Sequence, residues 1–121
     1  MYVVGLRNCV GDNRAMDEKL QTILAELREK LQELYGNRLV NVILFGSQAR
    51  GDATPESDID VMVVLRDSGA NGHEHVDASD IAYELSFKYD TLITLILVSQ
   101  ERFLSGQSPL LINVRREGVA I

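Results

Sequence analysis

Residues 42–64 of the chain read VILFGSQARGDATPESDIDVMVV. One apolar run opens this stretch, a second closes it, and a polar segment from Gly46 to Asp60 lies between them. Continuous apolar runs of this length are typical of buried strands. The polar residues therefore sit at a rigid edge of a hydrophobic core, and we expect the chemistry of the protein there.

The composition limits the class of the protein. A chain of 121 residues, 45% of them hydrophobic, is large enough for one domain with its own core. Its formal net charge of −6 argues against generic binding to nucleic acid or to an anionic membrane, because both need a basic surface. The single cysteine, Cys9, excludes an internal disulfide and cannot form a zinc site by itself. No apolar stretch has the length of a membrane span and no leader is recognisable, so we expect a cytoplasmic protein without a membrane partner.

The clearest helix is predicted over residues 17–35. Asp17 is suited to cap its first turn, and Gly36 to end it. Its apolar residues recur at the three-and-four spacing that forms one buried stripe. The stripe consists of Leu20, Ile23, Leu24, Leu27, Leu31 and Leu34.

Strands are predicted where apolar runs occur at residues 39–45, 59–65 and 92–98. A loop at 66–74 and a helix at 75–89 separate the second strand from the third. This order of helices and strands predicts an α/β fold of the α+β type, with helices packed on a small mixed β-sheet.

The C-terminal part of the chain predicts two short helices, at residues 100–104 and 108–117. Ser108-Pro109 supplies a cap and a first-turn proline, and Gly118 a stop. Residues 1–15 show no sustained period and are expected to form an arm or a short strand. The domain itself is predicted to span residues 16–121.

Gly46 and Ser47 are suited to bind phosphate. They leave a buried strand and enter a helical turn, where backbone N–H groups carry partial positive charge. Glycine allows a close approach of the backbone, the Ser47 hydroxyl can donate a hydrogen bond, and Arg50 can pair with phosphate oxygens.

Asp58 and Asp60 are candidate metal ligands. Two residues apart on a strand, they point to the same face with Cα atoms roughly 6–7 Å apart. Unpaired carboxylates would repel each other at this buried edge, and a hard cation between them removes that cost. Carboxylates combined with phosphate oxygens favour Mg²⁺ over zinc.

Other candidate sites are weaker. His73, Glu74 and His75, with Asp77, have metal-binding side chains, but their spacing is not the i, i+4 pair of a helical metal site, and we expect a solvated loop there. Ser47 lacks the Gly-x-Ser-x-Gly surroundings of a hydrolase nucleophile, and the glycine-rich stretch lacks a Walker ending.

The motif GSQARGD at residues 46–52, followed by SDID at 57–60 and an apolar strand, resembles the signature of the polymerase-β-type nucleotidyltransferase superfamily. It is most similar to the small stand-alone branch called minimal nucleotidyltransferases (MNT), and the likeness covers most of residues 17–121. The resemblance implies a nucleotidyltransferase-like fold in which Gly46 and Ser47 grip a nucleoside triphosphate. Asp58 and Asp60 would hold Mg²⁺, with room for a second ion. The family reaction transfers a nucleoside monophosphate to a hydroxyl and releases pyrophosphate.

The chain departs from the family pattern at one position. The resemblance implies a third acidic residue on the next strand, serving as metal ligand and base, and the matching position holds Thr94. Threonine is a poor base and a weak ligand. Asp90, four residues earlier, lies roughly 13 Å from Thr94 along an extended strand. It is expected to be a helix-to-strand turn residue, and could substitute only if the strand begins later or bends.

The resemblance leaves two functions open. The first is a Mg²⁺-dependent transferase that moves AMP from ATP to a partner macromolecule, with a HEPN-type toxin as the implied partner and this chain as its antitoxin. The domain is short, so we expect the partner to build part of the acceptor site. The alternative is a nucleotide-binding module without turnover that acts by direct contact with its partner. Asp58 and Asp60 favour the transferase and Thr94 favours the module, while the oligomeric state stays open.

Overall fold

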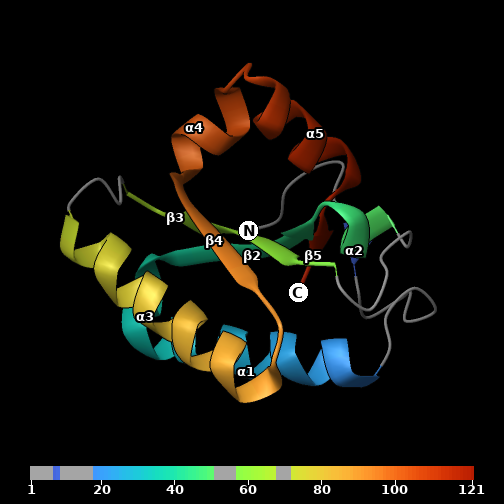
Figure 1. Ribbon diagram of the computed structural model, residues 1–121. Helices are drawn as coiled ribbons and strands as arrows, with labels where there is room; N and C mark the ends of the chain where they lie inside the picture. The colour runs from blue at the N-terminus through green and yellow to red at the C-terminus, as the bar shows by residue number, and fades with distance from the viewer. Residues whose placement is uncertain (1–6, 9–17, 51–56, 68–71) are drawn as a thin grey trace.

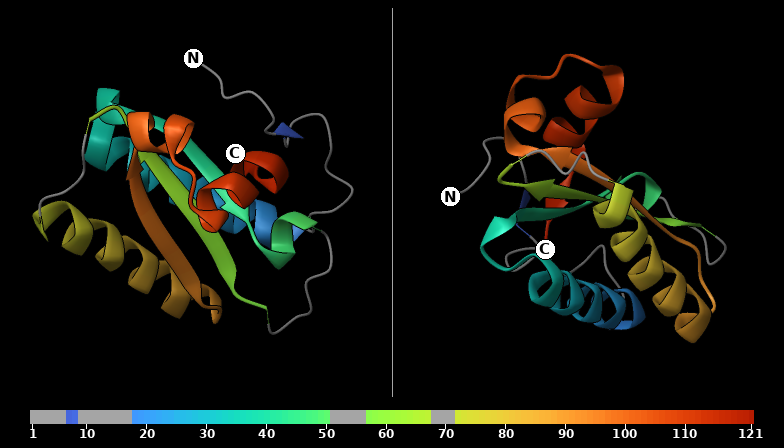
Figure 2. Two further views of the ribbon diagram at one scale, coloured as in Figure 1. Left: turned by 90° about the horizontal axis from the view of Figure 1, so that it is seen from above. Right: turned by 90° about the vertical axis from the view of Figure 1, so that its left-hand side faces the viewer.

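A five-stranded mixed sheet with helices on both faces forms the protein, as the computed structural model shows (Figures 1 and 2). The structure describes residues 7–8, 18–50, 57–67 and 72–121. Its helices and strands are β1 Arg7–Asn8, α1 Glu18–Tyr35, β2 Leu39–Phe45, α2 Ser47–Arg50, β3 Ile59–Leu65, α3 Gly72–Tyr89, β4 Ile93–Ser99, α4 Gln100–Ser105, α5 Pro109–Glu117 and β5 Val119–Ala120, with a 3-10 turn at Gly36–Arg38. The predicted α/β class with a small mixed sheet is confirmed.

The strand order in the sheet is β1-β5-β2-β3-β4. β2 and β3 are antiparallel, whereas β3 and β4 are parallel and are connected through α3. β5 pairs antiparallel with β2 and parallel with β1. Among the described strands, β4 therefore forms one outer edge of the sheet.

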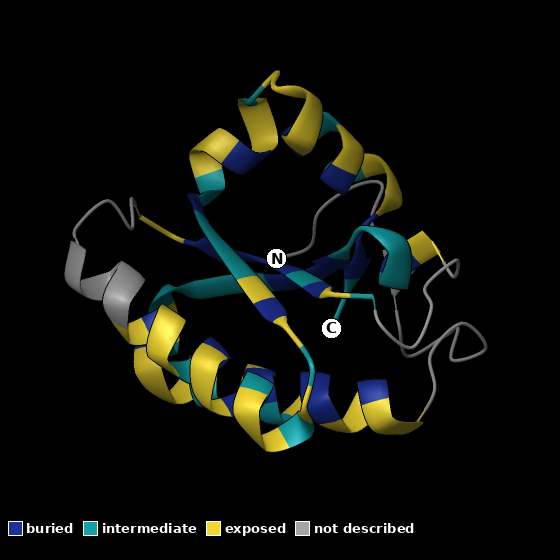
Figure 3. Ribbon diagram, in the orientation of Figure 1, coloured by how far each residue is buried: buried dark blue, intermediate teal, exposed yellow. Residues whose placement is uncertain are grey.

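The alternation of side chains along β3 divides the core between the two faces of the sheet. Ile59, Val61, Val63 and Leu65 belong to the cluster that includes the buried residues of α1 and α3. Met62 and Val64 belong to the second cluster, with residues of α4 and α5. Figure 3 shows the buried strands enclosed between these two helical layers. A strand that is apolar on both faces needs such double coverage.

The helix α1 runs to Tyr35 as predicted, and Gly36 follows it with a left-handed φ of +55°. The predicted stripe is wrong at Leu34, which is 38% exposed, while Tyr35 is only 6% exposed. The chain turns over the Tyr35 side, and the Arg38 guanidinium lies 5.9 Å from the centre of the Tyr35 ring. The proposed cap at Asp17 lies outside the described residues.

The predicted strands 39–45 and 59–65 are confirmed at both ends. The third strand begins at Ile93 and ends at Ser99, one residue later than predicted. The loop predicted at 66–74 is too long, because α3 begins at Gly72, so His73–His75 belong to a helix and not to a loop.

The C-terminal helices α4 and α5 are confirmed, and the Ser108 hydroxyl accepts the N–H of Leu111 as a cap. The short strand β5 after Gly118 was not predicted. Within the expected arm, Arg7–Asn8 form a strand beside β5; the rest of residues 1–15 lies outside the described residues, and the division at residue 16 stays a prediction. In the part of the chain that the structure describes, no helix combines the length and apolarity needed to cross a bilayer.

Candidate nucleotide and metal site

Three strand ends meet at one end of the sheet. β2 ends there with Phe45, and β3 and β4 begin there. Asp60 pairs laterally with Phe45 on one side and with Thr94 on the other. Since neighbouring strands lie about 4.8 Å apart, Phe45, Asp60 and Thr94 form one row across this end of the sheet, and Gly46 follows directly after Phe45. The residues predicted to share a site are therefore brought together.

Gly46 is required at its position for two reasons. Its φ is +77°, a left-handed conformation that L side chains rarely adopt. A Cβ atom at Gly46 would also lie 2.6 Å from Oδ2 of Asp60. The Gly46 carbonyl accepts the N–H groups of Ala49 and Arg50, both at 3.1 Å, and so starts α2. The missing side chain thus lets the Asp60 carboxylate rest against the backbone where α2 begins.

Side-chain contacts hold α2 in place. Ala49 is 1% exposed and belongs to the core cluster of α1 and α3. Gln48 Nε2 donates to the Ser57 carbonyl at 3.5 Å, which ties α2 to the segment entering β3. The predicted phosphate-binding residues and the predicted metal ligands are therefore fixed relative to each other.

Arg50 lies at the end of α2, where its Nη1 atom is 3.8 Å from Oε2 of Glu117 at the end of α5. Both side chains are about half exposed, at 47% and 46%. An ion pair this accessible to water contributes about 0–1 kcal/mol, so a phosphate can compete with Glu117 for the guanidinium. No local pattern in the sequence indicated Glu117, because the pairing of β5 with β2 brings the end of α5 to α2.

Asp58 and Asp60 differ in their surroundings. Asp58 precedes β3 and is exposed, whereas Asp60 lies within β3 and is half-buried. Burial raises the pKa of the Asp60 carboxyl above its usual value, and the neighbouring charge of Asp58 raises it further. Both effects disfavour the charged form of the Asp60 carboxyl, and a bound cation would offset them by favouring that form.

The donor set fits a hard cation. Asp58 and Asp60 offer carboxylate oxygens, which suit Mg²⁺ or Mn²⁺ and not zinc. Within the described residues, no group of three or more His, Cys, Asp or Glu side chains is arranged to hold a metal ion. A cation held here would complete its shell with water and phosphate oxygens, as Mg²⁺ commonly does.

Thr94 occupies the place beside Asp60 that the resemblance assigns to a third acid, and its side chain is exposed. Asp90 does not lie in β4, which begins later than predicted, so the separation along an extended strand does not apply to it. It forms the turn after α3 with a φ of +52°, and β4 begins only at Ile93. The expectation that Asp90 is a turn residue is confirmed.

The sheet, the glycine turn and the paired carboxylates define a nucleotidyltransferase domain. The family described as "Nucleotidyltransferase domain" matches residues 24–116, and the chain belongs to this family. The predicted membership, including the likeness to minimal nucleotidyltransferases, is confirmed.

Two relatives come from the archaeon Methanocaldococcus jannaschii, and both are provisionally named as protein adenylyltransferases. One, MJ1305, is 35% identical over 102 residues, which cover 82% of this chain and 69% of the relative. The other, MJ0604, is 39% identical over 80 residues, which cover 66% of this chain and 74% of the relative.

Solved structures share the fold. A protein described as a minimal nucleotidyltransferase superposes with a TM-score of 0.54 at 26% identity, over 84% of this chain and 94% of that one. A toxin–antitoxin structure with AMP-PNP gives 0.57 at 24% identity, over 78% and 69%. A complex of the tri-AMPylated Shewanella oneidensis HEPN toxin with its MNT antitoxin gives 0.53 at 22% identity, over 83% and 69%.

Proposed function

We propose that the chain transfers AMP from ATP to a hydroxyl group of a partner protein in a Mg²⁺-dependent reaction. The observation that carries the proposal is the contact between Gly46 and Asp60. It joins a turn suited to phosphate to a half-buried carboxylate whose pKa is raised by burial and by Asp58. Such a carboxylate favours a bound cation, and a cation beside a phosphate-binding turn is the arrangement that nucleotidyl transfer requires.

Each residue has a separate role in this proposal. The backbone at Gly46, the Ser47 hydroxyl and the Arg50 guanidinium bind and orient the triphosphate, with Arg50 exchanging Glu117 for phosphate oxygens. Asp58 and Asp60 would hold Mg²⁺, which when bound would offset the negative charge of the phosphoryl oxygens. The acceptor oxygen forms a bond to the α-phosphorus, the bond to pyrophosphate breaks, and the hydroxyl proton passes to solvent water.

A HEPN-type protein is the proposed acceptor, with this chain as its antitoxin. The proposal is supported by the solved complex in which an AMPylated HEPN toxin is bound to an MNT antitoxin of the same fold. The relatives named as protein adenylyltransferases support a protein as the acceptor.

One observation favours a second function, that of a nucleotide-binding module without turnover. Thr94 lies directly beside Asp60, and a threonine hydroxyl neither accepts a proton readily nor binds Mg²⁺ strongly. In this alternative, the chain inhibits its partner by contact alone.

The two functions are distinguished by intact-mass measurement. The chain is incubated with Mg²⁺, each nucleoside triphosphate in turn, and the purified product of the neighbouring gene. An increase in the partner's mass by one or more AMP groups is the expected result. A stable complex with no mass increase under any nucleotide would refute the transferase and support the module.

Variants test the site itself. Asp58→Asn combined with Asp60→Asn is expected to remove Mg²⁺-dependent ATP binding in titration calorimetry. Asp67→Asn, beyond the other end of β3, is the matched control and should bind as the wild type does. Unchanged Mg²⁺-ATP affinity in the double variant would show that the site is assigned wrongly.

A further inference from the structure

The outer edge of β4 has backbone groups that pair with no described strand. Among the described residues, β4 pairs only with β3, and the Ile59 N–H donates to the Leu92 carbonyl at 2.8 Å. In a parallel ladder, alternate residues of a strand bond to the neighbouring strand and the others point away. Ile93, Leu95 and Leu97 therefore direct their N–H and carbonyl groups outward.

The first of these outward groups is already occupied. The Ile93 N–H donates to Oγ of Ser86 at 3.0 Å, which supports the assigned alternation and closes this end of the edge. The backbone groups of Leu95 and Leu97 remain as the place where another strand can pair.

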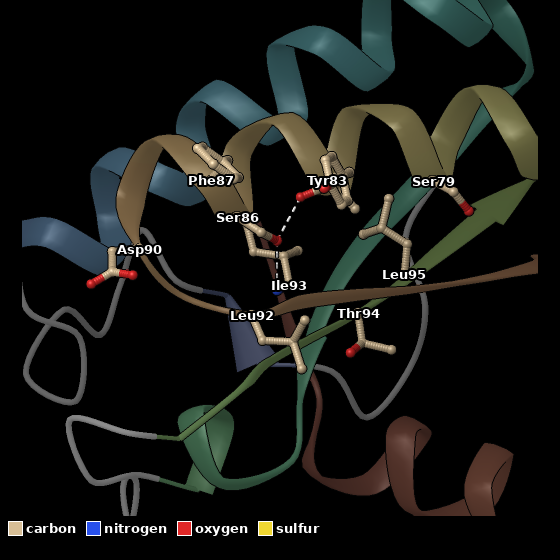
Figure 4. A pocket seen from close by; sticks show the side chains of 10 residues that line it. Ser79, Tyr83, Ser86, Phe87, Asp90, Leu92, Ile93, Thr94 and Leu95 are labelled. Atoms are coloured by element: carbon tan, nitrogen blue, oxygen red, sulfur yellow. Dashed lines mark hydrogen bonds between the residues drawn. The ribbon is translucent and has the colours of Figure 1, made fainter.

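An apolar groove lies beside this edge, between α3 and β4 (Figure 4). Its volume is about 520 Å³. Tyr83 and Phe87, one helical turn apart on α3, are 72% and 81% exposed, and Leu92 is 57% exposed. The two aromatic rings lie 6.4 Å apart, centre to centre. Large apolar side chains gathered beside an unpaired strand edge are typical of an interaction site and not of a free surface.

The candidate nucleotide site lies across β4 from the groove, on the other face of the sheet. Thr94 lines the groove and is the lateral neighbour of Asp60. Figure 4 shows Leu95 directed toward α3 and Thr94 directed to the other side of β4. A strand added to β4 opposite Thr94 would lie two strand spacings, about 10 Å, from the Asp60 strand. Its side chains on the Thr94 face would thus reach toward the site.

The charges near the groove indicate the nature of the added strand. The one charged residue among the described residues that line the groove is Asp90, which is acidic and exposed. Asp80, also exposed, lies on α3, where Glu84 and Lys88 are already paired with Lys30 and Glu26 of α1. Asp60 adds a further carboxylate beyond β4, on the face toward which Thr94 is directed. A second copy of this chain would bring the same acidic residues and a net charge of −6, so its approach is opposed by repulsion.

We propose that the β4 edge and the adjoining groove bind an extended, lysine- or arginine-bearing segment of the acceptor protein as an added strand. This inference rests on the proposed transferase function. The backbone groups of Leu95 and Leu97 set the position of the segment along the edge, and Tyr83 and Phe87 receive its apolar side chains. Binding through main-chain hydrogen bonds with pockets for alternate side chains is an established mode of peptide recognition.

Synthetic peptides test the inference without knowledge of the acceptor. The probes are short peptides with a central tyrosine flanked by alternating valine and lysine, and matching peptides with glutamate in place of lysine. Further lysine peptides carry N-methyl groups on alternate residues in one register or the other. Binding is measured by calorimetry, and hydrogen exchange is followed at the Leu95 and Leu97 amides.

The lysine peptides are expected to bind and to protect both amides, with roughly tenfold weaker binding, about 1.4 kcal/mol, for the glutamate peptides. N-methylation should abolish binding in one register only, because only alternate residues of the added strand face β4. Absence of amide protection with every peptide would overturn the inference, as would equal binding of both charge types. Protection that rises with protein concentration alone would also overturn it, because a second copy would then occupy the edge.

A pair of variants separates this inference from the proposed function. Phe87→Lys places a cation at a site that is 81% exposed, so the fold is preserved, and it is expected to weaken binding of the lysine peptides by roughly tenfold or more. Leu104→Lys on α4, 46% exposed, is the control and should not change peptide binding. Both variants should keep the Mg²⁺-ATP affinity of the wild type. If Phe87→Lys binds the peptides as the wild type does, the groove assignment is refuted and the nucleotide site is unaffected. If Asp58→Asn combined with Asp60→Asn leaves Mg²⁺-ATP binding intact, the proposed function is refuted instead.

Discussion

Replacing Gly46 with alanine has two effects that can be measured separately, because it strains the backbone of the turn and it displaces the Asp60 carboxylate. An alanine at this position must adopt a φ of +77°, which costs an L residue about 1–2 kcal/mol. The added Cβ atom would also lie 2.6 Å from Asp60 Oδ2, so the carboxylate must move. Because this atom is the end of a side chain, the additional cost is that of an unfavourable rotamer, about 0.5–1.5 kcal/mol. Gly46→Ala is therefore expected to lower the free energy of unfolding by roughly 1.5–3.5 kcal/mol.

Gly36→Ala is the matched control. Gly36 has a φ of +55°, but a Cβ atom there meets nothing within 4 Å, so only the backbone cost of about 1–2 kcal/mol applies. With an unfolding entropy of about 2.1 cal/mol/K per residue, this cost lowers the Tm of the 121-residue chain by roughly 4–8 °C. Gly46→Ala should lower the Tm by the same amount or more.

The decisive measurement is Mg²⁺-ATP binding by calorimetry at a temperature where both variants are folded. Gly46→Ala displaces Asp60 and should weaken binding by roughly tenfold or more, whereas Gly36→Ala should bind as the wild type does. Equal ATP affinity in the two variants would refute the assignment of Asp60 as a ligand held against the turn. A loss of affinity in Gly36→Ala as large as in Gly46→Ala would show that general destabilisation explains the effect.

Three further predictions follow from the site and the core. The pKa of Asp60 is higher in the folded state than in the unfolded state. The charged carboxylate therefore lowers the free energy of unfolding at neutral pH, and this loss disappears as the pH falls through the folded-state pKa to the unfolded value of about 4. In metal-free buffer, Asp60→Asn should thus melt at a higher temperature than the wild type at pH 7, with the difference closing near pH 4; a constant difference across that range would contradict the pKa shift. Thr94→Asp adds a carboxylate beside Asp60 and should tighten Mg²⁺ binding in a metal titration while lowering the Tm of the metal-free protein; unchanged Mg²⁺ affinity would place Thr94 outside the site. Leu27 is fully buried, so Leu27→Ala should lower the free energy of unfolding by about 2–5 kcal/mol in urea titrations. Leu34 is exposed, so Leu34→Ala should lower it by less than about 1 kcal/mol. Equal losses would contradict the assigned buried face of α1.

The sequence predicted correctly those helices and strands whose residue composition reflects how deeply they are buried. The strands at 39–45 and 59–65 are long apolar runs bounded by polar residues, and both ends of each are confirmed. The beginning of β4 was placed one residue early, because Leu92 is apolar and yet 57% exposed at the turn before the strand. The strand β5 has two residues, too few to display any period.

The candidate site was predictable where its residues lie close together in the sequence. The positions of Gly46, Asp58 and Asp60 followed from strand ends and spacing, and the place of Thr94 followed from the resemblance. Glu117 and the groove beside β4 were not found, because they depend on pairings between segments far apart in the chain. Residues 93–99 contain no charged residue or proline of the kind that marks many edge strands, so their sequence does not distinguish an edge strand from a central one.

The position of β5 has a consequence for synthesis of the protein. β2 acquires its first neighbour, β3, soon after both have left the ribosome, but its other neighbour is made only when residues 119–120 emerge. Until then, a central strand of the finished sheet has an open side. Loop closure over so much chain is slow, and an open strand in the nascent protein is exposed to pairing with other chains. Nascent chains that stop before Val119 should therefore aggregate or bind chaperones more than chains that include residues 119–120, although the turn at Gly46 and the carboxylates of β3 are already complete.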